Sequence, residues 1–485
     1  MTELLTILII VSYFTFLFLI SKWTKGSEDN DTFFLGKRSS PWYIVAYGMV
    51  GVSLSGITFL SVPGWVKAQE FYYMQMVLGF VPGYIFVAYI LMPIYYKMKV
   101  YSIYEYLKVR FGYFSHKSGA FFFFLSRTLG ASLRLFLVAK VLDLLFFSSF
   151  NIPFFVTSLF TIFFIWVYTH KGGIKTIIWT DTLQTTFMLL TVIICIYVIF
   201  KDLGFESVIQ SIEQNKLDLN FFLFDDFNDN RHFIRYFLSG MFISIAMTGL
   251  DQDMMQKNLS CKNIKEAQRN MVCFSLVLVF VNLLFLYLGS LLYEFASVNN
   301  IISDGDNLFV EIIKSEKLGV FVFITFLLGL MSAAYSSADS ALTSLTTSFC
   351  IDFLEMNTNN PNKTNVLKRK KLHIFISFLL FFIILLVYYL NDDNIISTLF
   401  TLASYTYGPL LGLFFFGIFT KRNINDHCVP LVVIISPLLT YIISIYDVLL
   451  IRFNFGYELL IINGLITFIF LFFISKPKSF LFDLE

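Results

Sequence analysis

Three serines, an alanine and an aspartate lie close together in an otherwise apolar part of the sequence. They are Ala333, Ser336, Ser337, Asp339 and Ser340. The alanine and the serines follow the i, i+3, i+4, i+7 spacing of one helical face, and the aspartate flanks that face. Their hydroxyl and carboxylate oxygens are hard ligands, which suit sodium better than thiolates or imidazoles would. Hydroxyls in membrane helices often bond only to a carbonyl of the preceding turn. Such local hydrogen bonds explain the presence of one or two of these hydroxyls, but not a whole helical face of them beside an aspartate.

A second polar stretch combines glycines with hydroxyl residues between Gly48 and Thr58, shortly before the pair Pro63-Gly64. Three glycines, two serines and a threonine within eleven residues make a poor helix. Small residues also suit a close contact between two helices. The alternative is a helix broken within the membrane, whose freed carbonyls bind a cation, as in transporters with discontinuous helices.

Acidic residues also occur within one apolar segment and at the end of another. Asp181 lies about five residues inside its segment, where it is either a charge at the membrane interface or a cation ligand from another helix. The stretch 249–256, with Asp251 and Asp253, either lines or gates an inner cavity or is a solvated helix end.

Two arginines, Arg127 and Arg134, are seven residues apart and therefore share one face of a helix. An arginine buried without a nearby acid is a natural partner for the carboxylate of a substrate, which it binds in bidentate fashion. A structural link to a carbonyl or to an aspartate on another helix is an equally good interpretation. The sequence leaves this choice open.

The elements that carry these residues must be membrane helices. Hydrophobic residues make up 57% of the 485 residues and charged residues only 14%, whereas soluble domains have about 25% charged residues. Lipid cannot satisfy exposed backbone groups, so each apolar stretch of about 20 residues is expected to be helical. We expect thirteen spans, at 4–22, 42–66, 71–96, 118–148, 153–169, 176–200, 236–255, 271–295, 319–350, 373–390, 395–419, 427–446 and 458–475.

The distribution of lysine and arginine predicts the orientation of these spans. With the N-terminus outside, 24 of the 35 Lys and Arg residues, Lys257 among them, fall in cytoplasmic segments and eight fall outside. We therefore expect a multi-pass protein of the cell membrane, with its N-terminus outside and its C-terminus in the cytoplasm.

Several classes of function are disfavoured by the same composition. The net charge is only +2, so nothing suggests nucleic acid, and the five cysteines form no CxxC pair. No GxxxxGK[ST] motif for an ATP-driven pump is present. All five histidines lie at or near span ends, which disfavours a histidine-based catalytic site within the membrane. We expect no enzyme and no cofactor; a passive channel and a sodium-dependent sensor remain as alternatives of another class.

Together these residues resemble the motifs of the sodium:solute symporter family, from about residue 33 to residue 422. The resemblance rests on the glycine- and serine-rich second span, Trp179-Thr180-Asp181, and Ala333-x-x-Ser336-Ser337-x-x-Ser340 with Phe349-x-x-Asp352. It implies an all-α membrane protein with a five-plus-five inverted repeat (LeuT-like) and discontinuous helices. The implied divisions are an N-terminal extra helix and the start of the first cytoplasmic loop at 1–32, a transporter core at 33–422 with repeats at about 42–200 and 236–419, and two C-terminal helices with a short cytoplasmic tail at 423–485.

The resemblance also implies ligands for the coupling ion, which would be sodium. The first sodium site would use backbone carbonyls and two hydroxyls of Gly51, Leu54, Ala333, Ser336 and Ser337. A possible second sodium site would use Asp181 with Ser336, Asp339 and Ser340. Some members of the family have a hydroxyl at the position of Asp339, so this carboxylate favours a second ion or a proton.

The implied solute is a small polar molecule. The stretch Ser53-Leu54-Ser55-x-x-Thr58 is similar to the substrate-facing stretch of the sialic acid transporting members, which also use an arginine that corresponds to Arg134 or, less well, to Arg127. Ser53, Ser55, Thr58 and Arg134 are therefore the expected solute ligands, and an anion such as sialic acid or a carboxylate is favoured. A neutral sugar, an amino acid or a vitamin is the alternative. We expect symport by alternating access, and function as a monomer.

Overall fold

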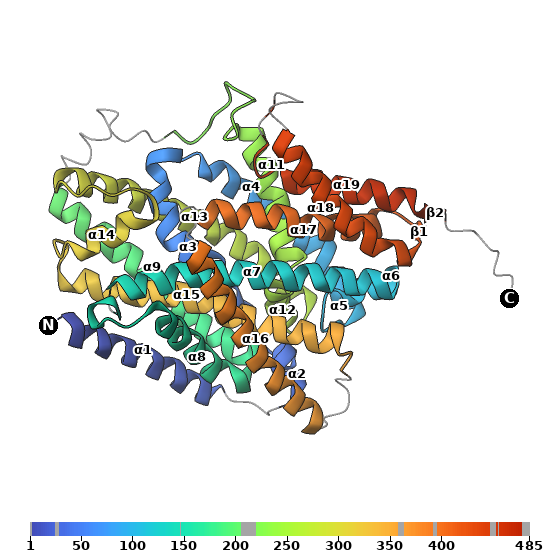
Figure 1. Cartoon of the computed structure of the whole chain (residues 1–485), viewed down its shortest axis with the longest axis horizontal. Coiled ribbons are helices and arrows are strands. Elements are labelled where there is room, and N and C mark those ends of the chain that lie inside the picture. The colour runs from blue at the N-terminus through green and yellow to red at the C-terminus, as the bar shows by residue number, and fades with distance from the viewer. Residues whose placement is uncertain are drawn as a thin grey trace.

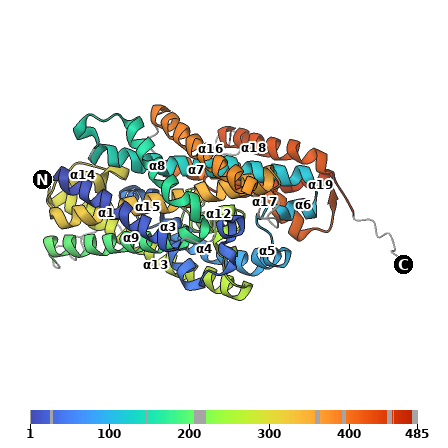
Figure 2. The same cartoon turned by 90° about the horizontal axis from the view of Figure 1, so that it is seen from below.

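The chain is an almost entirely helical bundle, and most of its long helices run along the longest axis of the molecule (Figures 1 and 2). The computed structural model describes residues 2–24, 29–145, 147–204, 220–356, 363–390, 395–446, 453 and 455–477. The α-helices of the first half are α1 (Thr2–Trp23), α2 (Asn30–Leu35), α3 (Trp42–Gln69), α4 (Tyr73–Phe86), α5 (Met92–Met98), α6 (Glu105–Arg110), α7 (Tyr113–Leu145), α8 (Phe154–Gly172) and α9 (Ile174–Leu203).

The second half repeats this mixture of long and short helices. Its α-helices are α11 (Phe233–Ser244), α12 (Gln252–Leu259), α13 (Ile264–Val298), α14 (Leu308–Lys314), α15 (Gly319–Ser348), α16 (Lys363–Leu390), α17 (Ile395–Phe419), α18 (Val429–Tyr446) and α19 (Leu459–Phe473). Short π-helical turns occur at η2 (Val87–Leu91), η4 (Ile245–Gly249) and η6 (Phe349–Phe353). Short 3-10 turns occur at η1 (Gly36–Arg38), η3 (Phe147–Phe150), η5 (Gly305–Asn307) and η7 (Asp426–Cys428).

The described strands form one small antiparallel ribbon. It pairs β1 (Asn423–Ile424) with β2 (Ser475–Lys476). The ribbon lies at the end of the molecule opposite to the start of α1 (Figure 1).

Membrane-spanning helices dominate the described chain. Nine helices are long and apolar enough to cross a membrane, or up to eleven if each of two bent pairs is one span. Two shorter apolar helices, Phe154–His170 and Leu459–Phe473, come in addition. The all-α membrane class is therefore confirmed, whereas the expected count of thirteen spans stays a prediction.

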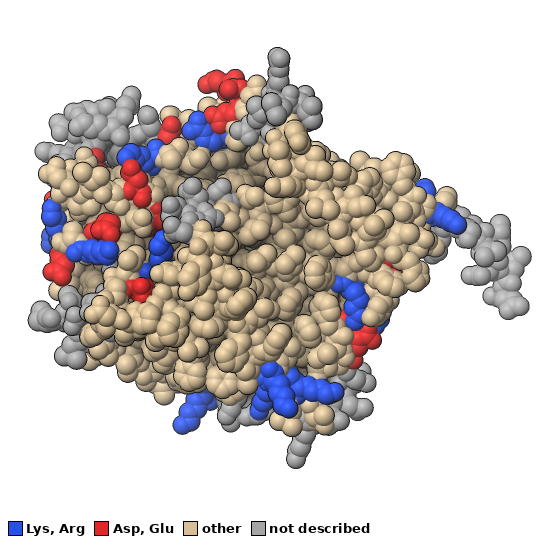
Figure 3. Space-filling model, viewed as in Figure 1, with Lys and Arg blue, Asp and Glu red and all other residues tan. Residues whose placement is uncertain are grey.

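The surface of the bundle agrees with a lipid environment. In the face shown in Figure 3, charged side chains gather toward opposite margins, and a broad belt of uncharged residues lies between them. Large apolar side chains on several long helices are more than half exposed, which lipid tolerates and water does not. Examples are Phe16, Phe121, Phe163, Tyr197, Phe280 and Phe375.

Small residues let the helices of the core approach closely. A Cβ atom added at Gly79 would collide with the backbone at Phe237, and one added at Gly240 would collide with the backbone at Met76. These two glycines therefore allow α4 and α11 to pack backbone against backbone.

Three other helices, α3, α9 and α15, pack closely on one another at the centre of the molecule. They carry most of the expected ion ligands.

Candidate functional site

Helix α3 is broken near its middle, as the glycine- and serine-rich sequence indicated. Its two parts, Trp42–Gly56 and Thr58–Gln69, are bent by 58°. Ser55 lies at the break with φ +30° and ψ 170°, a conformation that costs an L-residue of order 1–3 kcal/mol. The break therefore requires compensation from the surrounding structure or from a bound ligand.

A second break separates α11 and η4 from α12, with a bend of 64°. Asp251 begins α12: its side chain accepts hydrogen bonds from the backbone N–H groups of Asp253 and Met254, at 2.8 and 3.4 Å. The breaks in α3 and before α12 fall in the first span of each expected repeat. That correspondence agrees with the discontinuous helices that the family resemblance implied.

The two breaks differ in how their carbonyl oxygens are used. At the second break, Tyr95 donates to the Gly249 carbonyl at 3.0 Å and Tyr104 donates to the Leu250 carbonyl at 2.8 Å. No described side chain donates to the carbonyls of Gly51 or Leu54 beside the first break. Side-chain hydroxyls thus occupy carbonyls at the second break, whereas those of Gly51 and Leu54 have no side-chain donor among the described residues.

The expected ligands of the first cation site lie on α3 and α15, which pack on each other and on α9. Gly51, Leu54, Ala333, Ser336 and Ser337 are all buried. The Ser337 hydroxyl donates to the Ala334 carbonyl at 3.2 Å, and the Ser336 hydroxyl donates to Asp181 Oδ1 at 2.9 Å.

Gly51 is where α3 touches α9. A Cβ atom added there would overlap the Thr185 hydroxyl, which itself donates to the Asp181 carbonyl at 2.7 Å. The close contact and the broken helix were alternatives for the second span, and the structure combines them. Glycine at 51 permits the contact, and the break follows one turn later.

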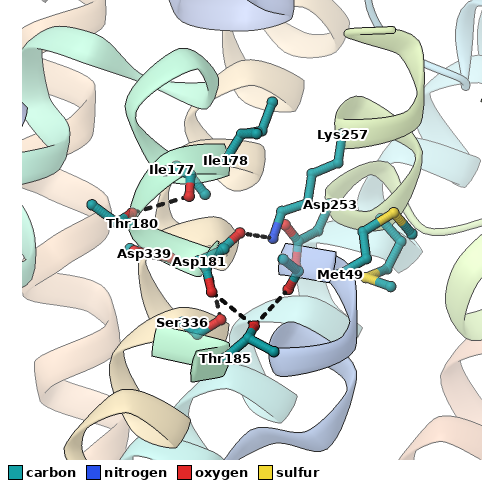
Figure 4. A network of polar contacts seen from close by, with 12 residues as sticks. Met49, Ile177, Ile178, Thr180, Asp181, Thr185, Asp253, Lys257, Ser336 and Asp339 are labelled. Carbon is teal, nitrogen blue, oxygen red and sulfur yellow. Dashed lines mark hydrogen bonds and ion pairs between the residues drawn. The ribbon is translucent and has the colours of Figure 1, made fainter. Parts of the chain in front are cut away.

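The expected second cation site contains a residue that the sequence analysis did not place there (Figure 4). Lys257, counted as a cytoplasmic charge, is instead buried, and its Nζ lies 2.6 Å from Asp181 Oδ2. Both side chains are 1% exposed. Asp181 is therefore not a charge at the membrane interface; it is a buried carboxylate that already has a cationic partner.

Asp339 and Ser340 keep unused oxygen atoms in the same cluster. Tyr168 donates to Asp339 Oδ2 at 2.9 Å, but Asp339 Oδ1 and the Ser340 hydroxyl are buried and have no hydrogen-bond partner among the described residues. When both carboxylates are ionised, Asp181 and Asp339 carry two negative charges against one on Lys257. A sodium ion at the unused oxygens would balance the cluster and satisfy groups that are otherwise costly to bury.

A cavity beside the break in α3 gathers the expected solute ligands. Ser53, Ser55, Thr58 and Arg134 all line it, and so does Arg127. Aromatic and apolar side chains and one amide, all of which the sequence analysis missed, complete the wall. They include Tyr73, Phe80, Tyr84, Met247 and Asn282.

The two arginines of the cavity have different surroundings. Arg127 forms an ion pair with Asp253 and lies 3.9 Å from Asp251. Arg134 forms no ion pair with any carboxylate in the described part of the chain, and its buried Nε has no hydrogen-bond partner there. The structural link to an aspartate on another helix thus holds for Arg127, and Arg134 is left with its charge unmatched.

The stretch 249–256 is not a solvated helix end, because its acidic side chains are buried.

Asp352, from the motif after the ninth span, lies apart from both sites. Its carboxylate is 2.9 Å from His116 Nε2 and accepts hydrogen bonds from Ser102 and Ser348 at 2.7 and 2.6 Å. These contacts join η6 to α7 and to the segment before α6. The geometry gives Asp352 a structural role.

Comparison with known proteins places the chain among transporters. The sequence model of the "Sodium:solute symporter family" matches residues 33–427. The sodium/sialic acid symporter SiaT of Proteus mirabilis is 26% identical over 434 residues, which is 86% of this chain and 85% of that protein. The sodium/sialic acid symporter NanT of Aliivibrio fischeri is 25% identical, over 86% of this chain and 83% of that protein.

A solved structure shares the fold. It is a Na⁺-coupled sialic acid symporter in a substrate-bound, outward-open state, with a TM-score of 0.82 and 21% sequence identity over 98% of this chain and 99% of that chain. The expected LeuT-like arrangement of an all-helical symporter is thereby confirmed.

Proposed function

The chain belongs to the sodium:solute symporter family, and on that premise we propose that it imports a sugar acid of the sialic acid type together with sodium. The protein is a sodium-coupled transporter and not an enzyme. The family leaves the solute open, so the argument for a carboxylate-bearing sugar comes from the cavity.

The observation that carries this proposal is the unmatched charge of Arg134 in the cavity beside the α3 break. An uncompensated guanidinium is costly in a membrane protein, and a carboxylate would pair with it in bidentate fashion. Ser53, Ser55 and Thr58 add hydroxyls on the same cavity wall, which suit the hydroxyl groups of a sugar. A neutral solute would leave the arginine charge unpaired.

The sialic acid symporters among the relatives support the same solute class. Their similarity extends over most of both chains. N-acetylneuraminic acid is therefore the solute that we propose to test first.

We assign sodium to two places in this proposal. The first site uses the carbonyls of Gly51, Leu54 and Ala333 with the hydroxyls of Ser336 and Ser337. The second site uses the carboxylates of Asp181 and Asp339 with the hydroxyls of Ser336 and Ser340. One sodium ion makes the import of a monoanion electroneutral; a second sodium adds a driving force of about 2.3 kcal/mol per 100 mV of membrane potential.

The same proposal gives the transport cycle. Sodium from outside joins α3 to α15 and stabilises a state open to the outside, the solute binds beside the break, and both leave on the cytoplasmic side after the helices rearrange. The division into 1–32, a core at 33–422 and 423–485, the N-terminus outside with the C-terminus inside, and function as a monomer remain part of this proposal. The start of α1 and the β1–β2 ribbon lie at opposite ends of the molecule, which agrees with termini on opposite sides (Figure 1).

The proposal is tested by calorimetric titration of the purified protein with N-acetylneuraminic acid, in sodium and in potassium. We expect binding in sodium that Arg134→Gln weakens by at least about tenfold, or about 1.4 kcal/mol. Lys140→Gln, which removes a charge from the same helix outside the cavity lining, is the matched control and should leave the affinity unchanged. Equal binding by the protein and its Arg134→Gln variant would contradict the role of Arg134. Binding of a neutral sugar in preference to the acid would contradict the solute class.

A further inference from the structure

Helix α12 carries two buried charges that point to different sites. Asp253 and Lys257 are four residues apart and therefore lie on one face of the helix. Asp253 pairs with Arg127 of the solute cavity, and Lys257 pairs with Asp181 of the cation cluster. All four side chains are at most 5% exposed. A continuous series of charges thus runs from the solute cavity to the cation cluster.

We propose that this series is a relay that couples the two sites. Sodium that binds at Asp181 displaces the Lys257 ammonium, Lys257 pairs with Asp253 instead, and Arg127 is released toward the anionic group of the solute. The proposal rests on the sodium-coupled function proposed above and deepens it, because it names the residues that transmit ion binding to the solute cavity.

The local geometry lets Lys257 change partners. Figure 4 shows its ammonium turned to Asp181, with Asp253 beside it on the same helix. Asp253 Oδ1 is buried without a hydrogen-bond partner among the described residues, so it has an unused acceptor for this ammonium. Lysine also has a flexible four-carbon stem and three donors, which allow it to move between neighbouring carboxylates.

The exchange leaves both Asp181 and Asp253 with a counter-ion. Sodium replaces the ammonium at Asp181 one charge for one, and Lys257 then replaces the guanidinium at Asp253 in the same way. Without sodium, loss of Lys257 would leave the Asp181 carboxylate uncompensated, which is costly in a buried site. The ion pair with Asp181 is therefore stable until a cation arrives.

The released arginine is already in position to meet the solute. Arg127 lines the cavity together with Arg134, and its buried Nε has no hydrogen-bond partner among the described residues. Once Asp253 has Lys257 as its counter-ion, Arg127 keeps only the longer contact of 3.9 Å with Asp251 and gains by pairing with an anionic solute. The coupling is reciprocal: a solute that pairs with Arg127 leaves Asp253 to Lys257 and so raises the sodium affinity of Asp181.

The relay predicts opposite effects on sodium binding in the absence of any solute. Sodium affinity is measured by thermal stabilisation of the purified protein during sodium titration, with potassium replacing sodium at constant ionic strength. Lys257→Gln removes the competing ammonium and should raise sodium affinity by about tenfold. Asp253→Asn removes the alternative partner of Lys257 and should lower it by about tenfold. Arg127→Gln leaves Asp253 unpaired and should raise it, although Arg127 has no contact with Asp181.

Lys262→Gln is the matched control, because it removes an exposed lysine five residues beyond Lys257; it should leave sodium affinity unchanged. If all three buried variants shift sodium affinity in one direction, or none shifts it, the relay is wrong and the residues are structural. If Lys257→Gln does not fold, the opposite effects expected of Asp253→Asn and Arg127→Gln decide the question. If the unmodified protein is stabilised equally by sodium and potassium, the sodium-coupled function proposed above fails, and the relay fails with it.

A second readout uses N-acetylneuraminic acid as the probe. Sodium should raise the affinity of the unmodified protein for this acid, and should raise it much less in Lys257→Gln, where no ammonium can release Arg127. An undiminished sodium effect in Lys257→Gln would overturn the relay while leaving sodium coupling itself intact.

Discussion

The Ser336 hydroxyl donates a hydrogen bond of 2.9 Å to Asp181 Oδ1 and so connects α15 to α9. The same serine is an expected ligand of the first sodium site, and its bonding partner belongs to the cluster proposed for the second. Ser336 is therefore shared by the two proposed cation sites, and a change there should affect both.

We expect Ser336→Ala to lower the apparent sodium affinity of uptake by at least about tenfold. The variant loses one sodium ligand and also one hydrogen bond to a buried carboxylate. Sodium titration of uptake measures the effect. Ser344→Ala is the matched control, because Ser344 is buried on the same helix but donates only to the Ala341 carbonyl at 3.0 Å. Equal sodium affinities of the two variants would show that Ser336 is not a ligand.

Asp339→Asn should change the dependence of uptake on voltage more than its dependence on sodium. The variant removes the charge whose Oδ1 has no partner among the described residues, so the second sodium loses one of its carboxylate ligands. Uptake by the unmodified protein should rise with an inside-negative potential, and uptake by Asp339→Asn should be insensitive to it while still requiring sodium. Potassium–valinomycin potentials imposed on proteoliposomes test this. A variant that keeps the full voltage response would argue against a second sodium at Asp339.

Ser55→Gly should separate stability from solute binding. Glycine adopts the positive φ of this position without strain, so thermal stability should be retained or should rise by about 1 kcal/mol. Solute affinity should nevertheless fall, because the hydroxyl is lost from the cavity wall. Ser55→Ala is the comparison, and should lower both quantities. The prediction fails if Ser55→Gly is less stable than Ser55→Ala.

Gly51→Ala should weaken the contact between α3 and α9. The added Cβ would overlap the Thr185 hydroxyl, and overpacking of this kind typically costs about 1–3 kcal/mol. The second change Thr185→Ala should restore most of the lost stability, which thermal unfolding in detergent would reveal. The control is Gly130→Ala, since a Cβ there meets only Leu399 at 3.4 Å. A stable Gly51→Ala protein would contradict the close packing.

The sequence could place most of the proposed ion ligands on their helices, because these residues are close together within each helix. The serines of α15 share a face through helical spacing alone, and the small residues around Ser55 directly indicate a break. The topology and the family resemblance then bring α3 and α15 together. The cavity could be predicted to the same degree, since Ser53, Ser55 and Thr58 lie on one short segment.

The residues that the sequence analysis missed depend on contacts between distant segments. Lys257 follows a polar stretch at the end of its span, so counting charges assigned it to the cytoplasm, and only the bend before α12 turns it toward Asp181. The choice between Arg127 and Arg134 was open for the same reason, because the partner Asp253 is 126 residues away. A signal was present for Asn282, an amide inside an apolar span, but nothing in its neighbourhood indicated the cavity.

Uptake of N-acetylneuraminic acid into proteoliposomes under an imposed inward sodium gradient tests the central claim most directly. We expect accumulation above the outside concentration that collapses when sodium is equal on both sides, and that is strongly reduced in Ser337→Ala, which lacks one hydroxyl of the first sodium site. Flux of the acid that is indifferent to the sodium gradient, or equal in Ser337→Ala, would contradict sodium-coupled symport through this site.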